Sequence, residues 1–199
     1  MYQLDFSLLP TFEQSTAWMS LPEHIESALK ALASTHDRAR GALHFAYGVW
    51  NGYSHYGVKE REANLRASLA EFVSMEEALK RDLLPSMGRP ILISSSSNPL
   101  LHVTRELRNL EIHLHSATLT SAQKNAMFAG ENVQIQIWVA DDITEAQFKQ
   151  LRNSKFYSNA DIKRMLNWFN ASQKEWGIAD LIFRSVCEYG SNIIAKYGL

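Results

Sequence analysis

The sequence NPLLHVTRELRNLEIHLH, residues 98–115, decides how the chain is expected to fold. Asn98 is a good helix N-cap and Pro99 suits the first helical position, so a helix is expected to begin here. Apolar residues then recur at intervals of three and four along the stretch: Leu100, Val103, Leu107, Leu110 and Leu114. This spacing is typical of a helix that packs one face against a core.

The opposite face of this predicted helix has an unusual composition. At about 100° per residue, it carries a set of mostly polar side chains: His102, Arg105, Arg108, Asn109, Ile112 and His113. Two arginines, two histidines and an amide are groups that a catalytic site or a symmetric contact between two copies would use. We therefore take this face as the candidate site. The alternative is an ordinary surface on which Arg108 pairs with Glu106 or Glu111.

The composition is that of a soluble globular protein. The chain has 199 residues, of which 46% are hydrophobic and 21% charged, and its formal net charge is −1. A charge so close to zero gives no general attraction to nucleic acid or to an anionic membrane, so binding to a polyanion would need a local basic patch. The single cysteine, Cys187, excludes a disulfide framework within the chain. Neither a secretion signal nor a membrane span is predicted, so we expect a cytoplasmic protein without a membrane partner.

The rest of the chain is predicted to be mainly helical. Residues 1–21 have no clear period and are expected to form an N-terminal extension over the body of the fold. The helical period predicts helices in further ranges: 22–50, 59–84, 144–153, 159–174 and from 178 onwards. The first two are long and are separated by a short segment with two glycines, which predicts an antiparallel pair.

One strand is predicted at residues 133–139, where Val133, Ile135, Ile137 and Val139 alternate with other residues. A strand needs a partner, and three candidates stay open: residues 90–94, residues 112–120 or a second copy of the chain. Residues 116–120 are read as irregular. The predicted fold class is mainly α, a bundle of four to five helices with a small β appendage. It forms a single domain over residues 1–199, with residues 116–143 as an insertion that contains the strand.

Arg108, Asn109 and His113 resemble the signature of the HEPN superfamily, which is an arginine, a polar residue that is often asparagine, and a histidine after four to six intervening positions. The order of elements is also similar, because two long antiparallel helices come first and the signature lies on a later helix. The resemblance implies a metal-independent endoribonuclease of toxin–antitoxin or phage-defence systems. Such a hydrolase uses no cofactor, acts on RNA as a homodimer, and can have an antitoxin or another protein as partner. The alternative is a non-catalytic HEPN-like dimer that binds RNA, a nucleotide or a protein.

The side chains of this signature suit RNA cleavage through attack of the 2′-hydroxyl. Histidine can accept or donate a proton near neutral pH, so His113 is the expected general base or acid. Arg108 would hold phosphate oxygens and stabilise the charge of the transition state. Asn109 would orient the hydroxyl or the histidine of the second copy. The expected product is a 2′,3′-cyclic phosphate, formed without metal.

Three further residues complete the candidate site. His102 and Arg105 are expected to bind flanking phosphates. His115 is also at a permitted spacing from Arg108 and is the second candidate for the acting histidine. If His113 and His115 lay on a strand, both imidazoles would point to one side and could bind a metal. No further ligand lies at a suitable spacing, so no metal site is predicted.

Two other segments share parts of the signature. Arg38 and His44 have the same permitted spacing, and Arg152-Asn153 repeats the arginine–asparagine pair without a following histidine. Neither has the leucine-rich context of Arg108. We therefore retain residues 108–113 as the candidate signature.

Overall fold

The structure is a computed structural model that describes residues 1–11, 20–50, 57–83, 88–114, 118–128 and 131–199. For residues 111–114 and 126–128 it describes the backbone alone. The described residues form seven α-helices: α1 (Glu23–Leu29), α2 (Ala33–Trp50), α3 (Val58–Asp82), α4 (Pro99–Leu114), α5 (Glu145–Lys149), α6 (Asn159–Trp176) and α7 (Ile178–Tyr197). Strands β1 (Leu119–Phe128) and β2 (Glu131–Ala140) form one antiparallel sheet. The predicted class, a helical bundle with a small β appendage, is confirmed.

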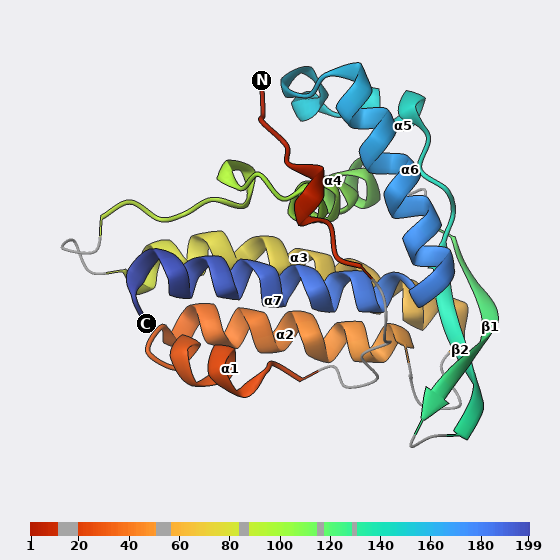
Figure 1. The fold of residues 1–199 in the computed structure, drawn as a ribbon, viewed down its shortest axis with the longest axis horizontal. Coiled ribbons are helices and arrows are strands. Elements are labelled where there is room, and N and C mark those ends of the chain that lie inside the picture. Colours follow the sequence, from red (N-terminus) through yellow and green to blue (C-terminus); the bar gives the residue numbers. More distant parts are fainter. Residues whose placement is uncertain (12–19, 51–56, 84–87, 115–117, 129–130) are drawn as a thin grey trace.

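Helices α2, α3 and α7 lie side by side and form the base of the bundle, with α1 next to α2 and α7 (Figure 1). Helix α4 crosses above α3 and α7, and α6 rises steeply from the start of α7 (Figure 1). The core is continuous between these elements, since large apolar side chains of α3, α6 and α7 are fully buried in it: Leu69, Phe72, Phe169, Ile182 and Tyr189. Helix α4 therefore contacts both the base, through α3 and α7, and α6.

The helix predicted over residues 22–50 is two helices, because the chain turns at residues 30–32. The turn is stabilised from the far end of α3, where Asp82 accepts hydrogen bonds from the Ser34 amide (3.2 Å), the Thr35 amide (2.7 Å) and the Thr35 hydroxyl (2.8 Å). A carboxylate at this position satisfies the free N–H groups of the first turn of α2. The cap comes from a distant residue, so the local helical period does not predict the break.

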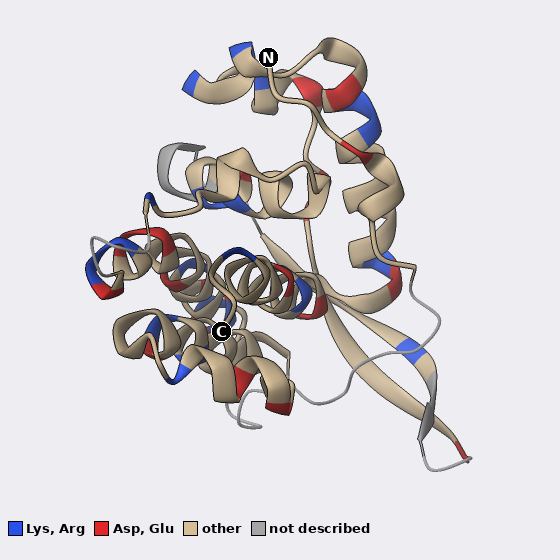
Figure 2. Ribbon diagram, turned by 60° about the vertical axis from the view of Figure 1, so that its left-hand side comes forward, with Lys and Arg blue, Asp and Glu red and all other residues tan. Residues whose placement is uncertain are grey.

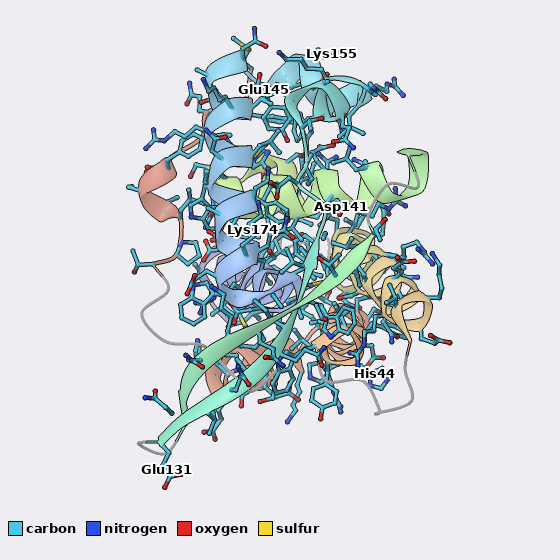
Figure 3. All side chains as sticks on the ribbon, turned by 90° about the vertical axis from the view of Figure 1, so that its right-hand side faces the viewer. His44, Glu131, Asp141, Glu145, Lys155 and Lys174 are labelled. Carbon is cyan, nitrogen blue, oxygen red and sulfur yellow. The ribbon has the colours of Figure 1, made fainter. Side chains whose placement is uncertain are left out.

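The partner of the predicted strand is β1, with Leu119 opposite Ala140 and Phe128 opposite Glu131. Of the candidate range 112–120, only Leu119 and Thr120 belong to β1, and the prediction that these two are irregular is wrong. The sequence of β1 has little apolar alternation, and its pairing with β2 supplies the hydrogen bonds that make it a strand. The hairpin reaches away from the bundle, with Glu131 at its far end (Figure 3).

Three short 3-10 helices complete the described fold: η1 (Phe6–Leu8), η3 (Ile93–Ser95) and η4 (Arg152–Phe156). The N-terminal segment packs on η4 and on the start of α4, since the Tyr2 amide donates to the Phe156 carbonyl (2.7 Å) and the Asp5 amide donates to the Ser97 carbonyl (2.8 Å). Within the described part of the chain, no helix is both long and apolar enough to cross a membrane.

Candidate functional site

Helix α4 begins where the sequence predicts. Asn98 accepts a hydrogen bond from the Leu100 amide at 2.9 Å, as an N-cap does, and Pro99 is the first helical residue. The described members of the predicted apolar stripe are buried: Leu100, Val103, Leu107 and Leu110. The N-terminal half of α4 is also buried on its opposite side, because η4, α6 and the N-terminal segment cover it. The partly exposed side chains among the described residues of α4 are therefore Arg105, Arg108 and Asn109.

His102 lies in the protein interior and is 0% exposed. Its Nδ1 is 2.9 Å from the Tyr157 hydroxyl and its Nε2 is 2.8 Å from the Ser96 carbonyl oxygen. The Tyr2 ring packs edge-on against the imidazole, with 4.7 Å between the ring centroids. A carbonyl only accepts, so Nε2 carries the hydrogen. Burial lowers the pKa of His102, which keeps the imidazole neutral at pH 7. The prediction that His102 lies on an accessible face and binds a phosphate is therefore wrong.

Glu106 is the centre of a buried hydrogen-bond network and is 0% exposed. Its carboxylate accepts from the side-chain amide of Asn109 at 2.9 Å and from that of Asn153 at 3.1 Å. The Arg105 guanidinium lies at 3.4 Å and the Tyr157 hydroxyl at 3.5 Å. From the sequence, Glu106 is expected only as an alternative ion-pair partner of Arg108. The signal that could have identified its role is the spacing of three residues to Asn109, which places both on one helix face.

Arg105 is half-buried and held between two carboxylates. It forms an ion pair with Glu106, and Glu76 of α3 is a second acidic neighbour. Burial alone would lower the pKa of Arg105, but these two carboxylates outweigh that effect and raise it. Burial also raises the pKa of Glu76, whose carboxylate accepts a hydrogen bond from the Ile93 amide. The positive charge of Arg105 is thus largely balanced within the protein, which leaves less of it for an external phosphate.

Arg108 and Asn109 form the part of the candidate site that is accessible, and both side chains are half-buried. Arg108 donates from Nη1 to the Asn109 Oδ1 at 3.3 Å, and its Nε is buried with no hydrogen-bond partner among the described groups. The alternative in which Arg108 pairs with Glu106 is wrong, since Arg105 is the cation in that ion pair. No described carboxylate lies within ion-pair distance of Arg108. Its charge is therefore not balanced by any described group.

His113 continues α4 in its backbone, but its side chain lies outside the described residues, as do the side chains of Glu111 and Ile112 and the whole of His115. The roles predicted for the two histidines stay predictions. Because α4 is helical to Leu114, His113 does not lie on a strand, and the metal-binding alternative loses its geometric basis. In the described part of the chain, no three His, Cys, Asp or Glu side chains are grouped in a way that could hold a metal ion.

The other two partial matches do not form a second site. Arg38 binds both carboxylate oxygens of Glu71 at 3.0 and 2.9 Å, so its charge is balanced. His44, which is labelled in Figure 3, is exposed. It lines a surface hollow beside α1 and α2. Asn153, from the second arginine–asparagine pair, instead contributes to the network around Glu106.

Comparisons with known proteins do not add a relative. No protein-family model, no curated protein and no solved structure matches this chain. Functional inference therefore depends on the residues of α4 and on their surroundings.

Proposed function

We propose that this chain is a metal-independent endoribonuclease of the HEPN type, which acts as a homodimer. The observation that carries the proposal is the state of Arg108, a half-buried guanidinium at the C-terminal half of α4 with no described carboxylate in ion-pair range and with Asn109 beside it. With respect to the described residues the charge of Arg108 is unbalanced, which leaves this cation available to an external anion. Guanidinium groups match phosphate oxygens in geometry and charge.

The proposed reaction is attack of a ribose 2′-hydroxyl on the adjacent phosphorus atom. The new bond forms between that oxygen and phosphorus, and the bond from phosphorus to the 5′-oxygen of the next nucleotide breaks. The His113 imidazole accepts the hydroxyl proton, and the departing 5′-oxygen takes up a proton from water. Arg108 stabilises the negative charge on the non-bridging oxygens. The products are a 2′,3′-cyclic phosphate and a 5′-hydroxyl.

The helical geometry supports the participation of two copies. Residues 108 and 113 are five positions apart on α4, so their side chains leave the helix axis at directions about 140° apart. One copy is therefore poorly suited to place both groups on one phosphate. A two-fold dimer in which the C-terminal halves of two α4 helices face each other would combine Arg108 of one copy with His113 of the second copy.

The charge distribution supports a selective enzyme rather than one that degrades any RNA. The net charge is −1, and Figure 2 shows Lys and Arg interspersed with Asp and Glu over the helices. With His102 buried and Arg105 balanced by carboxylates, Arg108 is the main described cation of the site. Affinity would thus depend on the dimer cleft. A cytoplasmic toxin or phage-defence nuclease restrained by an antitoxin or another protein partner fits this character.

The same observation favours one second candidate, a non-catalytic HEPN-like dimer that binds RNA, a nucleotide or a protein through Arg108. The two candidates differ in one respect. A binding protein would retain RNA without forming a cyclic phosphate end.

The test is RNA cleavage in the presence of EDTA by the wild type and by Arg108→Ala, Asn109→Ala and His113→Ala. We expect the arginine and histidine variants to lose about 100-fold or more in rate, which is typical for loss of a transition-state charge stabiliser or an essential proton-transfer group. Two variants serve as controls outside the site: Arg38→Ala and His24→Ala. Unchanged cleavage by Arg108→Ala would refute the proposed role of this residue. Binding without cleavage by the wild type would favour the second candidate.

A further inference from the structure

Two arginine–asparagine pairs meet at one buried carboxylate. Arg108-Asn109 is on α4 and Arg152-Asn153 is on η4, and each asparagine donates its side-chain amide to Glu106. The Asn109 Nδ2 lies 2.9 Å from Oε2, and the Asn153 Nδ2 lies 3.1 Å from Oε1 and 3.4 Å from Oε2. Segments that are 44 residues apart in the sequence, counted from Asn109 to Asn153, are thereby joined at the candidate site.

The carboxylate determines the orientation of the Asn109 amide. An asparagine amide has a donor end and an acceptor end of nearly equal shape, and an ionised carboxylate only accepts. The donor end of Asn109 must therefore face Glu106, which directs its Oδ1 to Arg108 at 3.3 Å. In this orientation Asn109 presents an acceptor beside Arg108, and an acceptor is the group that a 2′-hydroxyl or a protonated imidazole would need.

We propose that Glu106 is a positioning residue of the RNA-cleaving site, which fixes the Asn109 amide with its oxygen toward Arg108 and ties η4 to α4. This inference rests on the proposed function. Glu106 is 0% exposed and so acts through Asn109 rather than on RNA. Glu106 has four neighbours in this network. They are the side-chain N–H groups of Arg105, Asn109 and Asn153 and the Tyr157 hydroxyl. Such supporting residues hold a reacting group in its productive geometry.

The variant that isolates this role is Glu106→Gln, which keeps the shape of the side chain. The glutamine amide has one donor end, so at least one of the two asparagine amides would face a donor and have to turn. We expect a decrease in kcat of about 10-fold with little change in KM, because a small misplacement of a reacting group lowers the rate of the chemical step. The pH profile should keep its shape, since Glu106 transfers no proton.

The matched control is Asp180→Asn on α7. Asp180 is also a buried carboxylate, 3% exposed, and it pairs with Arg184 at 2.7 Å outside the candidate site. Asp180→Asn should destabilise the fold without lowering kcat. An equal decrease in kcat for both variants would overturn the inference, because it would indicate a general loss of folded enzyme.

A second measurement does not depend on activity. In ¹⁵N NMR spectra of the full-length wild type, the side-chain NH₂ of Asn109 should exchange slowly with solvent, and its signal should shift in Glu106→Gln. Rapid exchange in the wild type would overturn the inference even if the variant did not fold. Full kcat in Glu106→Gln, while the wild type cleaves RNA, refutes the positioning role alone. A wild type that does not cleave RNA refutes the proposed function and this role with it.

Discussion

Two arginines three residues apart on α4 are expected to respond to substitution in opposite ways. Arg105 pairs with Glu106, which is 0% exposed, and has Glu76 as a second acidic neighbour. Arg105→Ala would leave a buried carboxylate without its cation. Removing one partner of a buried pair costs about 3–5 kcal/mol, and we discount this to about 2 kcal/mol because the 3.4 Å contact is long and asparagine amides also bind Glu106. For a chain of this size, the loss corresponds to a decrease in Tm of about 4–8 °C.

Arg108 makes a single hydrogen bond to the described residues, of 3.3 Å to Asn109, and its Nε is buried without a described partner. Arg108→Ala removes little that stabilises the fold and also removes an unsatisfied group, so we expect a change in unfolding free energy within about 0.5 kcal/mol. Its effect should instead fall on RNA cleavage. Arg105 is thus expected to be mainly structural and Arg108 mainly functional.

Thermal denaturation followed by circular dichroism at pH 7, together with RNA cleavage assays, measures both effects. The control for surface substitution is Arg66→Ala on α3, which is expected to change neither quantity. If Arg108→Ala lowers Tm as much as Arg105→Ala does, Arg108 is a structural residue and the distinction between the two arginines is wrong.

Two further predictions concern the cap of α2 and the dimer. Burial alone would raise the pKa of Asp82, but hydrogen bonds from Thr35 and Ser34 outweigh burial and lower this pKa. The cap therefore stabilises the fold fully at a pH above the ordinary carboxyl pKa. This stabilisation is lost as the pH falls through the lowered pKa that Asp82 has in the folded protein. Asp82→Asn should lower the free energy of unfolding by about 1 kcal/mol at pH 7 and by less in acid. Urea unfolding at the two pH values measures this, and an equal loss at both would contradict the prediction. Mixing inactive Arg108→Ala and His113→Ala proteins should restore up to about a quarter of the wild-type activity if the two groups come from different copies. In a random mixture half of the dimers contain both variants, and each of these has one intact site out of two. A mixture as inactive as its components would count against the shared site.

Much of the fold is encoded in local sequence. The α4 boundary follows from Asn98 and Pro99, and a capping box of Thr144 and Gln147 starts α5 within the range in which a helix is predicted. Such features depend on residues within one turn of each other. The break before α2 depends instead on Asp82, which is 47 residues from Thr35, and the pairing of β1 depends on the next strand, β2.

The candidate site was predicted less completely for the same reason. The helical period places His102 on the face opposite the leucines, but that face is covered by Tyr2 and Tyr157, which are far away in the sequence. No local pattern indicates such a covering layer. Likewise, the connection between Asn153 and Glu106 depends on how η4 packs against α4. The sequence identifies the chemically capable residues, and tertiary packing decides which of them reach solvent.

The most direct test of the proposed function is the chemical identity of the RNA ends formed by purified wild-type protein in EDTA. Mass spectrometry of a short RNA after incubation should detect a fragment that ends in a 2′,3′-cyclic phosphate and a second fragment with a 5′-hydroxyl. The same RNA with 2′-O-methyl groups should remain intact, because the attacking hydroxyl is blocked. Cleavage of the methylated RNA, cleavage only after addition of a divalent metal ion, or no cleavage at all would contradict the proposed mechanism.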